Sequence, residues 1–176
     1  TTFGVPNQKI RGVCVLSDGR IVTSWNDEKV HIWDTNGQPL SMLDINVFKL
    51  EKLSDDRIIS HDKEFMMRLW NSDFQLLATM DKHTHGTQVH ELSDGRLLSF
   101  GWDKIICLWG QDGEHLMTFE SHLAYVSSAT FLDNQYLLSS SSDGTLRIWD
   151  TYRIPVNQRK PHIDTVNCIK VVSKRR

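Results

Sequence analysis

One pattern recurs four times along the chain: a short strand that reaches a hydroxyl residue, a tight polar turn, and a second strand that ends in tryptophan. The last copy, SSSSDGTLRIWD over residues 139–150, shows it most clearly. Asp143 and Gly144 are turn residues, and the stretch that follows them has the β-branched and aromatic residues that strands favour. The closing tryptophans, spaced by 37, 39 and 40 residues, are Trp33, Trp70, Trp109 and Trp149. Such a period indicates repeated units that bury their apolar faces against one another.

Two further columns keep a fixed distance from each tryptophan. A hydroxyl residue stands ten positions before it, and an acidic residue stands six positions before it. The hydroxyl residues are Thr23, Ser60, Ser99 and Ser139, and the acids are Asp27, Glu64, Asp103 and Asp143. Because both columns stay in register over four copies, the repeat is not a chance coincidence of residue types.

With this pattern the chain resembles the WD40 family, whose repeats of about 40–45 residues each form one four-stranded blade of a β-propeller. The Trp-Asp pair for which the family is named is intact in the first and fourth repeats, whereas Asn71 and Gly110 replace its aspartate in the others. The resemblance implies an all-β, WD40-type β-propeller segment over residues 1–176, with four four-stranded antiparallel blades and one extra strand. The repeats are expected at about 7–45, 46–82, 83–121 and 122–161, with a partial fifth at 162–176.

Four blades and a lone further strand, expected at 165–172, do not make a propeller of the family's usual size. WD40 propellers usually hold seven blades, which is about 280 residues at ~40 per repeat. Three arrangements stay open: a segment of a larger propeller, a ring completed by other copies of this chain, or a blade shared by residues 1–5 and 165–172. The first is favoured because His162 begins a fifth unit correctly.

In the family, the repeated polar residues form a hydrogen-bonded set within each blade, together with a histidine that precedes the first strand. The physical reason is that a buried tryptophan N–H needs an acceptor, and a hydroxyl group that accepts it can bond onward to an imidazole held by an acid. The fourth repeat has His122, Ser139, Asp143 and Trp149 for this set.

The other repeats depart from this set to different degrees. The third has Ser99, Asp103 and Trp109, with either His83 or His85 as the histidine. In the first two repeats asparagine replaces histidine, and their sets would be Asn7, Thr23, Asp27 and Trp33, and Asn46, Ser60, Glu64 and Trp70. The second set departs furthest from the pattern because glutamate also replaces aspartate.

A Ser-His-Asp set also invites interpretation as a catalytic triad. We reject that interpretation because the set recurs, its hydroxyl is expected to bond tryptophan, and the chain has no Gly-x-Ser-x-Gly motif. A metal site at His83, His85 and His90 would lack cysteine or carboxylate partners at ligand spacing. We therefore expect no enzyme, no cofactor and no metal.

Residues directly before the turn acid point, in the family, toward the propeller face that binds proteins and peptides. Tryptophans there are informative, because exposed tryptophan is a frequent interface anchor. The alternative is that each indole lies flat over the neighbouring blade. The candidate partner-binding residues are Trp25, Asn26, Lys63, Trp102, Tyr125 and Ser142.

Composition and net charge limit the classes of partner and the cellular location that we expect. A net charge of −2 argues against nucleic acid, which needs a basic footprint. No apolar run approaches the ~18 residues of a membrane span. Three scattered cysteines are typical of reduced cytosolic chains.

The sequence thus predicts a cytoplasmic, non-catalytic scaffold or adaptor. Its partner would be a protein or peptide on the top face of the propeller, with self-association to complete the ring as a further option. The alternative is a sensor or regulatory propeller of a larger signalling enzyme, a kinase or NTPase.

Overall fold

The computed structural model describes residues 2–133, 135–151 and 157–159, and all regular elements in these ranges are β-strands. They form four antiparallel sheets of four strands each, which confirms the predicted all-β class and its blade count. The extra strand and partial repeat predicted within residues 162–176 lie outside the described residues. Within the described ranges, no helix has the length and apolar character needed to cross a membrane.

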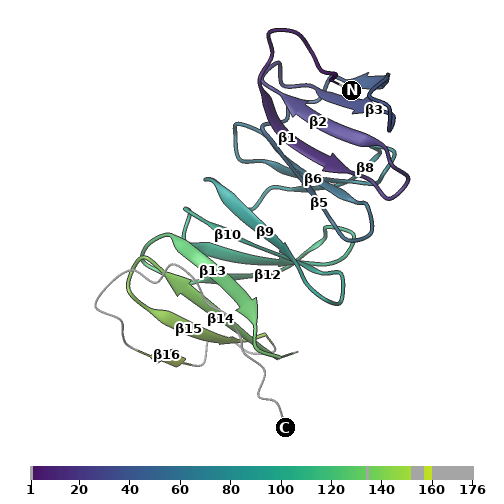
Figure 1. Cartoon of the computed structure of the whole chain (residues 1–176). Helices are drawn as coiled ribbons and strands as arrows, with labels where there is room; N and C mark the ends of the chain where they lie inside the picture. The colour runs from purple at the N-terminus through teal and green to yellow at the C-terminus, as the bar shows by residue number, and fades with distance from the viewer. Residues whose placement is uncertain (1, 134, 152–156, 160–176) are drawn as a thin grey trace. The chain divides into compact units, whose positions relative to one another are not determined.

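Each sheet pairs its strands in chain order, and we call the sheets blades 1 to 4 (Figure 1). Blade 1 consists of β1 (Ile10–Val15), β2 (Ile21–Trp25), β3 (Val30–Trp33) and β4 (Pro39–Leu43). Blade 2 consists of β5 (Lys49–Lys52), β6 (Ile58–His61), β7 (Met67–Trp70) and β8 (Leu76–Met80). Blade 3 consists of β9 (Thr87–Glu91), β10 (Leu97–Gly101), β11 (Ile105–Trp109) and β12 (His115–Glu120). Blade 4 consists of β13 (Val126–Phe131), β14 (Tyr136–Ser141), β15 (Leu146–Asp150) and β16 (Asn157–Arg159).

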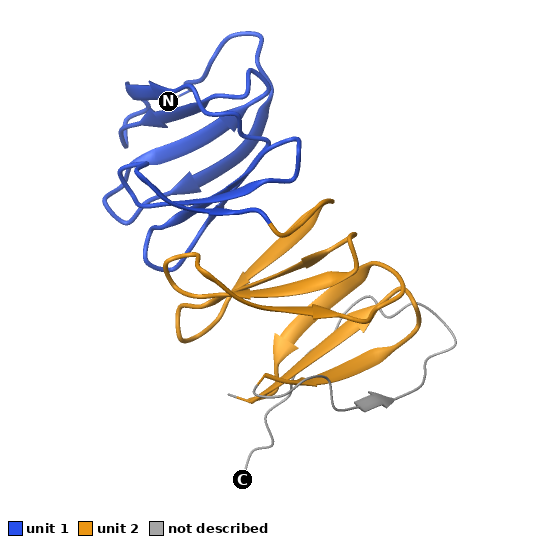
Figure 2. Cartoon of the chain, turned by 180° about the vertical axis from the view of Figure 1, so that it is seen from behind, with its two compact units in different colours: residues 1–81 blue, residues 82–176 orange. Residues whose placement is uncertain are grey.

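The chain divides into two compact units (Figure 2). Unit 1, residues 1–81, contains blades 1 and 2, and unit 2, residues 82–176, contains blades 3 and 4. Each unit is described by itself below.

The hairpin turns follow from local side-chain chemistry. In the β1–β2 turn, Asp18 Oδ1 accepts the backbone N–H of Arg20 at 2.9 Å, and Gly19 has φ 90°. A positive φ is accessible to glycine at little steric cost. In blade 2 Asp56 takes the place of this glycine with φ 68°, which an aspartate tolerates better than most residues.

Strand register places alternate side chains on opposite faces of a blade. In blade 1, Val22 lies opposite Ile32 and Ser24 lies opposite Val30, and we call their side the front face. The other side is the rear face. It carries Val13, Thr23 and Trp33 in blade 1, and the same register positions define it in the other blades.

Each unit buries a front face against a rear face. In unit 1 the front face of blade 1 and the rear face of blade 2 share one apolar core, whose members include Val22, Val30, Ile32, Leu50, Ile58 and Trp70. In unit 2 blades 3 and 4 repeat this arrangement with Leu98, Ile106, Leu108, Ala129, Leu137 and Trp149. Burial of large apolar side chains is the main stabilising term for such a core.

Candidate interaction surface

Blade 4 forms the polar set that the resemblance implies. Trp149 Nε1 donates to Ser139 Oγ at 2.8 Å. His122 Nε2 lies 2.7 Å from the same oxygen, and His122 Nδ1 lies 3.0 Å from Asp143 Oδ2. Ser139 can therefore donate to Nε2 while Nδ1–H donates to the carboxylate, so one polar relay joins the core tryptophan to the turn.

Blade 3 builds the same relay with His83. Its Nε2 lies 2.7 Å from Ser99 Oγ and its Nδ1 lies 2.7 Å from Asp103 Oδ2. Trp109 Nε1 donates to Ser99 Oγ at 2.7 Å. The exposed His85 instead lies with Nδ1 3.0 Å from Thr84 Oγ1, so of the two sequence candidates His83 occupies the position.

Electrostatics keep the acids of these sets ionised. Burial raises the pKa of Asp143, but bonds from the Thr145 hydroxyl, the Leu123 amide and His122 outweigh it and hold the pKa well below its usual range. The pKa of Asp103 is also lowered, since its bonds outweigh burial in the same way. Burial lowers the pKa of His122 more than Asp143 raises it. The blade 4 relay is thus a neutral His122 imidazole beside the Asp143 carboxylate.

This geometry is structural rather than catalytic. Ser99 and Ser139 are fully buried, and each already accepts a tryptophan N–H. A nucleophile needs an exposed oxygen within reach of a substrate. The two relays therefore cannot attack a substrate in this arrangement.

Blade 1 replaces the histidine with an indole. Trp33 Nε1 and Trp25 Nε1 both donate to Thr23 Oγ1, at 2.8 and 2.7 Å. Asp27 lies 3.3 Å from His31 Nε2 and caps the turn through Lys29 N, while Asn7, the sequence candidate for the histidine position, is exposed. At 4% exposed, Trp25 cannot anchor a partner, which corrects its inclusion in the candidate surface.

Blade 2 uses a different acid from the one predicted. Trp70 Nε1 donates to Ser60 Oγ at 2.8 Å, but the turn is capped by Asp62, whose Oδ1 accepts the backbone N–H groups of Glu64 and Met66. Asp62 Oδ2 lies 2.9 Å from Arg68 Nη1. Glu64 and Asn46 are exposed, so the prediction that Glu64 is the structural acid is wrong. Asp62 is two residues nearer Ser60, and its side chain turns inward to Arg68.

In unit 1 the exposed sequence candidates are tied to the unit itself. Asn26 exchanges hydrogen bonds with the backbone of Lys9, as donor through its N–H and as acceptor through Oδ1. Lys63 Nζ forms an ion pair with Glu28. Both side chains are therefore engaged before any partner arrives.

In unit 2 the remaining candidates come together. Trp102 is 70% exposed, and its ring centroid lies 5.9 Å from that of Tyr125. The backbone fixes both loops, because Trp102 N donates to Gly86 O and Ser142 N donates to Tyr125 O. Leu123, two residues before Tyr125, is 78% exposed and was missed by the sequence analysis, although an apolar residue in a polar loop was a usable signal. We call Trp102, Leu123 and Tyr125 the Trp102 patch.

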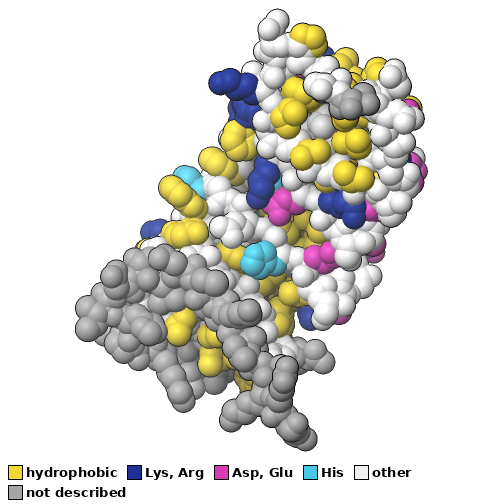
Figure 3. Space-filling view, in the orientation of Figure 1, with side chains coloured by type: hydrophobic (Ala, Val, Ile, Leu, Met, Phe, Trp, Pro, Cys, Tyr) yellow, Lys and Arg dark blue, Asp and Glu magenta, His cyan; other side chains and the backbone are white. Residues whose placement is uncertain are grey.

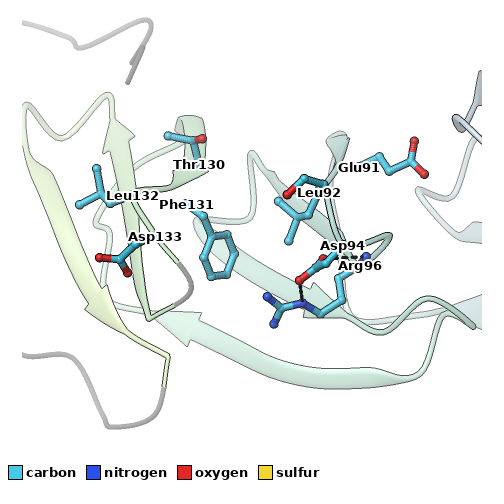
Figure 4. A pocket seen from close by; sticks show the side chains of 9 residues that line it. Glu91, Leu92, Asp94, Arg96, Thr130, Phe131, Leu132 and Asp133 are labelled. Carbon is cyan, nitrogen blue, oxygen red and sulfur yellow. Dashed lines mark hydrogen bonds and ion pairs between the residues drawn. The ribbon is translucent and has the colours of Figure 1, made fainter. Parts of the chain in front are cut away.

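A pocket of about 380 Å³ opens elsewhere in unit 2, between the β9–β10 and β13–β14 turns (Figure 4). Two of its charged groups form an ion pair: Arg96 Nε lies 2.8 Å from Asp94 Oδ2, and the guanidinium lies 5.3 Å from the centroid of Phe131. Phe131 occupies the register position that Lys52 has in blade 2.

The corresponding seam of unit 1 is bridged by polar contacts. Ser17 donates to Asp56 Oδ2 through its backbone N–H and its hydroxyl, and Lys52 Nζ lies 2.8 Å from Asp56 Oδ1. These contacts lower the pKa of Asp56 to about 2, with the Lys52 bond as the largest cause. The same seam is thus bridged across the blades in unit 1 and hollow in unit 2.

Other chemistry finds little support among the residues that the structure describes. There, no group of three or more His, Cys, Asp or Glu is placed to hold a metal ion. Cys14 and Cys107 are free thiols, and burial raises the pKa of Cys107 to about 11. A thiol with a raised pKa is a poor nucleophile at neutral pH.

Comparisons with known proteins agree with this architecture. Residues 113–150 match the family model described as WD domain, G-beta repeat. A search of curated proteins finds no match. Among solved structures, the computationally designed Ika8 protein is 19% identical with a TM-score of 0.69, and the alignment covers 98% of this chain and 55% of Ika8.

Two further solved structures give similar values. U3-55K is 18% identical with a TM-score of 0.62, and 92% of this chain aligns with 55% of that one. The RRP9 WD40 repeats are 19% identical with a TM-score of 0.61, and 83% of this chain aligns with 49% of theirs. The chain spans about half the length of all three structures. Residues 113–150 thus match a WD40 repeat, and the four four-stranded sheets have the fold of WD40-type propeller blades.

Proposed function

We propose that this chain is a non-catalytic interaction module that docks a protein or peptide segment on the Trp102 patch. WD40 repeats generally serve protein interaction, which supports the class of function but does not identify a partner. The patch supplies the location, because it is an apolar surface on loops whose backbone is held by the blades.

The exposure of Trp102 is the observation that carries the proposal. The other five tryptophans are at most 8% exposed, whereas Trp102 is 70% exposed. Leaving so large an apolar ring in water forgoes stabilisation that burial would give. Tryptophan and tyrosine are also the residues most enriched at the energetic centres of interfaces.

The charges around the patch favour a partner with an apolar anchor. Asp103 and Asp143 turn inward to their histidines, with only 5% and 7% of their side chains exposed. Lys104, two positions after Trp102, is exposed. One lysine on a chain of net charge −2 is no nucleic-acid footprint, so a protein or peptide is the better candidate.

A cytoplasmic location accords with the free thiols of Cys14 and Cys107. The same patch would also serve a regulatory propeller attached to a catalytic domain. No feature of the described residues favours that alternative over a free-standing adaptor.

The test uses a displayed library of random peptides selected on the immobilised chain, with counter-selection on the Trp102→Ala variant. Affinities of the selected peptides are then measured by calorimetry. We expect Trp102→Ala to weaken binding at least about thirtyfold, as an interface hot spot does. Tyr125→Ala should weaken binding less, because its ring mainly supports Trp102.

The matched control is Leu76→Ala in unit 1, which removes a side chain that is 51% exposed and lies outside the patch. It should leave the affinity unchanged. The proposal fails if no peptide is enriched over the counter-selected background, or if the selected peptides bind Trp102→Ala as tightly as the wild type.

A further inference from the structure

The β9–β10 turn of unit 2 has the same sequence as the β1–β2 turn of unit 1. Residues 92–96 and residues 16–20 both read LSDGR. In each turn the glycine N–H donates to the leucine carbonyl, at 2.9 Å in unit 2 and 3.0 Å in unit 1. The arginine Nε lies 2.8 Å and 2.6 Å, respectively, from the aspartate Oδ2. The two turns therefore present equivalent groups, among them Ser93 and Ser17, to the next blade.

In unit 1 this turn binds a carboxylate. Ser17 donates to Asp56 Oδ2 through its backbone N–H, at 2.9 Å, and through its hydroxyl. Lys52 Nζ lies 2.8 Å from Asp56 Oδ1, and Figure 3 shows acidic and basic side chains beside one another over this part of unit 1. Hydrogen bonds to an ionised acceptor are about twice as strong as those between neutral groups. The chain itself thus shows what the serine of such a turn holds.

In unit 2 the place of that carboxylate is open. Gln135 has the turn position of Asp56, but its side chain donates to Asp150 Oδ2 within blade 4, at 3.3 Å. Within the ranges that the structure describes, Ser93 forms no hydrogen bond through its backbone N–H or its hydroxyl. The donor pair that holds a carboxylate in unit 1 therefore lines a pocket of about 380 Å³ in unit 2.

A cation remains in this seam, although it comes from the other blade. Phe131 replaces Lys52, and the Arg96 guanidinium lies 5.3 Å from the centroid of the Phe131 ring. Figure 4 shows Arg96 and Phe131 on the two sides of the pocket. The bond to Asp94 uses Nε of Arg96, so the N–H groups of its two terminal nitrogens are left for another acceptor.

The apolar part of the lining suits a short aliphatic stem. Leu92, Phe131 and Leu132 line the same pocket, and Leu132 is 38% exposed. The volume lies at the small end of the range of ligand pockets. The pocket therefore has room for a carboxylate and a few carbon atoms behind it.

The acids around the pocket do not exclude a further carboxylate. Asp94 is paired with Arg96, and Asp133 Oδ1 accepts two backbone N–H groups of its own turn, both at 2.8 Å. Glu91 also has an interaction partner. In unit 1, Asp18 stands at the position of Asp94, directly after the serine, and a carboxylate is bound there all the same.

We propose that the pocket between the β9–β10 and β13–β14 turns binds a carboxylate carried on a short aliphatic stem. Ser93 donates to it through its N–H and its hydroxyl, Arg96 supplies the positive charge that Lys52 supplies in unit 1, and the stem packs on Phe131. A glutamate side chain of a peptide and a free carboxylic acid share this chemistry. The proposal does not depend on the Trp102 patch, which lies at the other end of β10.

The experiment follows the amide resonances of the ¹⁵N-labelled chain by NMR, at constant ionic strength, during titration with two carboxylates. The probes are sodium butyrate and a capped tripeptide with a central glutamate. We expect saturable shifts of the Ser93 amide with dissociation constants of about 1–10 mM, as so small a ligand allows. Butyramide and the matching glutamine tripeptide, which lack the charge, should cause no saturable shift. The Ser17 amide is the internal control and should not respond, because Asp56 already occupies it.

Variants test the assigned groups. Ser93→Ala should weaken the binding of both carboxylates about tenfold, because it removes one hydrogen bond to a charged acceptor. Ser93 is exposed, so this variant should keep the wild-type circular dichroism. The matched control is Ser17→Ala, the same change in the other turn, which should leave the affinity unchanged.

A filling variant tests the comparison between the seams. Phe131→Lys combined with Gln135→Asp gives unit 2 the residues that bridge the seam in unit 1, and it should abolish binding of both probes. Circular dichroism checks its fold. If the double variant does not fold, Ser93→Ala decides.

The absence of a saturable Ser93 shift up to about 100 mM of either carboxylate would overturn the proposal. So would equal shifts with the uncharged probes, or an unchanged affinity of Ser93→Ala. Tighter binding of the glutamate tripeptide than of butyrate supports the site with a peptide side chain as its ligand. Binding of butyrate that is at least as tight supports it with a free carboxylic acid.

Discussion

The two units build the same repeated position with different chemistry. In unit 2, a buried histidine lies between a serine and an aspartate in both blades. In unit 1, Trp25 takes the place of the imidazole in blade 1, and the Asp62–Arg68 pair replaces the acid–histidine pair in blade 2. The bond from tryptophan to a hydroxyl persists in all four blades at 2.7–2.8 Å. The constant of the fold is therefore this buried bond, and the imidazole is one of several ways to complete it.

This difference decides which aromatic residue remains for a partner. In unit 1 the indole N–H of Trp25 donates to Thr23 Oγ1, and the indole is buried. In unit 2 His83 is the hydrogen-bond partner of Ser99, and Trp102 remains exposed to solvent. The residue that fills the histidine position of a blade thus decides whether a nearby tryptophan is buried or remains on the surface.

The largest expected effect concerns these two tryptophans. Trp25→Ala should lower the free energy of unfolding by about 3–5 kcal/mol, because it leaves a cavity and an incompletely bonded hydroxyl. Trp102→Ala should cost at most about 1 kcal/mol, mainly the loss of its contact with Tyr125. Urea unfolding followed by circular dichroism measures both values.

Trp25→Phe separates the contribution of apolar packing from that of the hydrogen bond to Thr23. It keeps most of the apolar volume and loses only the bond to Thr23, so it should cost about 1–2 kcal/mol. Equal losses for Trp25→Ala and Trp102→Ala would contradict the contrast between the units.

A second contrast lies in the turn acids. Asp103→Asn should cost about 1–3 kcal/mol, because it removes the charged acceptor of a buried imidazole. Glu64→Gln should change stability by less than about 0.5 kcal/mol, since this side chain is exposed. Urea unfolding of the two variants beside the wild type gives the answer, and a costly Glu64→Gln would restore the role that the sequence assigned to it.

Acidification should affect the blade 4 relay through His122 first. Burial holds the pKa of His122 below its ordinary value of 6.5, so below that pH the unfolded chain binds a proton that the folded chain does not. Stability contributed by a neutral His122 is therefore lost as the pH falls below about 6.5. The low pKa of Asp143 places its own contribution above 3.8, and that contribution is lost only in more acidic solution.

The measurement compares free energies of unfolding at pH about 7.5 and about 5 for the wild type and His122→Gln. The variant should be less stable at the higher pH but less sensitive to acid. The Asp62–Arg68 pair of blade 2 contains no imidazole, so the prediction concerns blade 4 alone. If the wild type became more stable on acidification, the assignment of a neutral His122 would be wrong.

Much of the fold was readable from the sequence because the repeat has a fixed period. The hydroxyl–tryptophan spacing predicted a contact that every blade makes, from Trp33 and Thr23 to Trp149 and Ser139. Such a contact depends on strand register alone, and register is set by turns whose residues recur.

The wrong predictions concern residues at strand ends. There, an even or an odd number of positions after the hydroxyl residue decides on which face of the blade a side chain lies. Trp25 and Asp62 stand two positions after their hydroxyl residues and so share the rear face with them, whereas Trp102 stands three positions after Ser99. This parity was present in the sequence. What the sequence did not show is that Trp25, and not Asn7, takes the place of the missing histidine beside Thr23.

A small effect is also expected at Lys63, an exposed cation of unit 1. Its ion pair with Glu28 joins side chains that are 52% and 33% exposed, and exposed pairs contribute about 0–1 kcal/mol. Lys63→Ala should therefore change stability by at most about 1 kcal/mol and, because Lys63 is already paired within unit 1, leave peptide affinity within about twofold of wild type. Calorimetry with the peptides selected on the Trp102 patch provides the measurement. A tenfold loss of affinity would mean that unit 1 contributes to the docking surface after all, and that engagement with Glu28 orders Lys63 for a partner rather than withdrawing it.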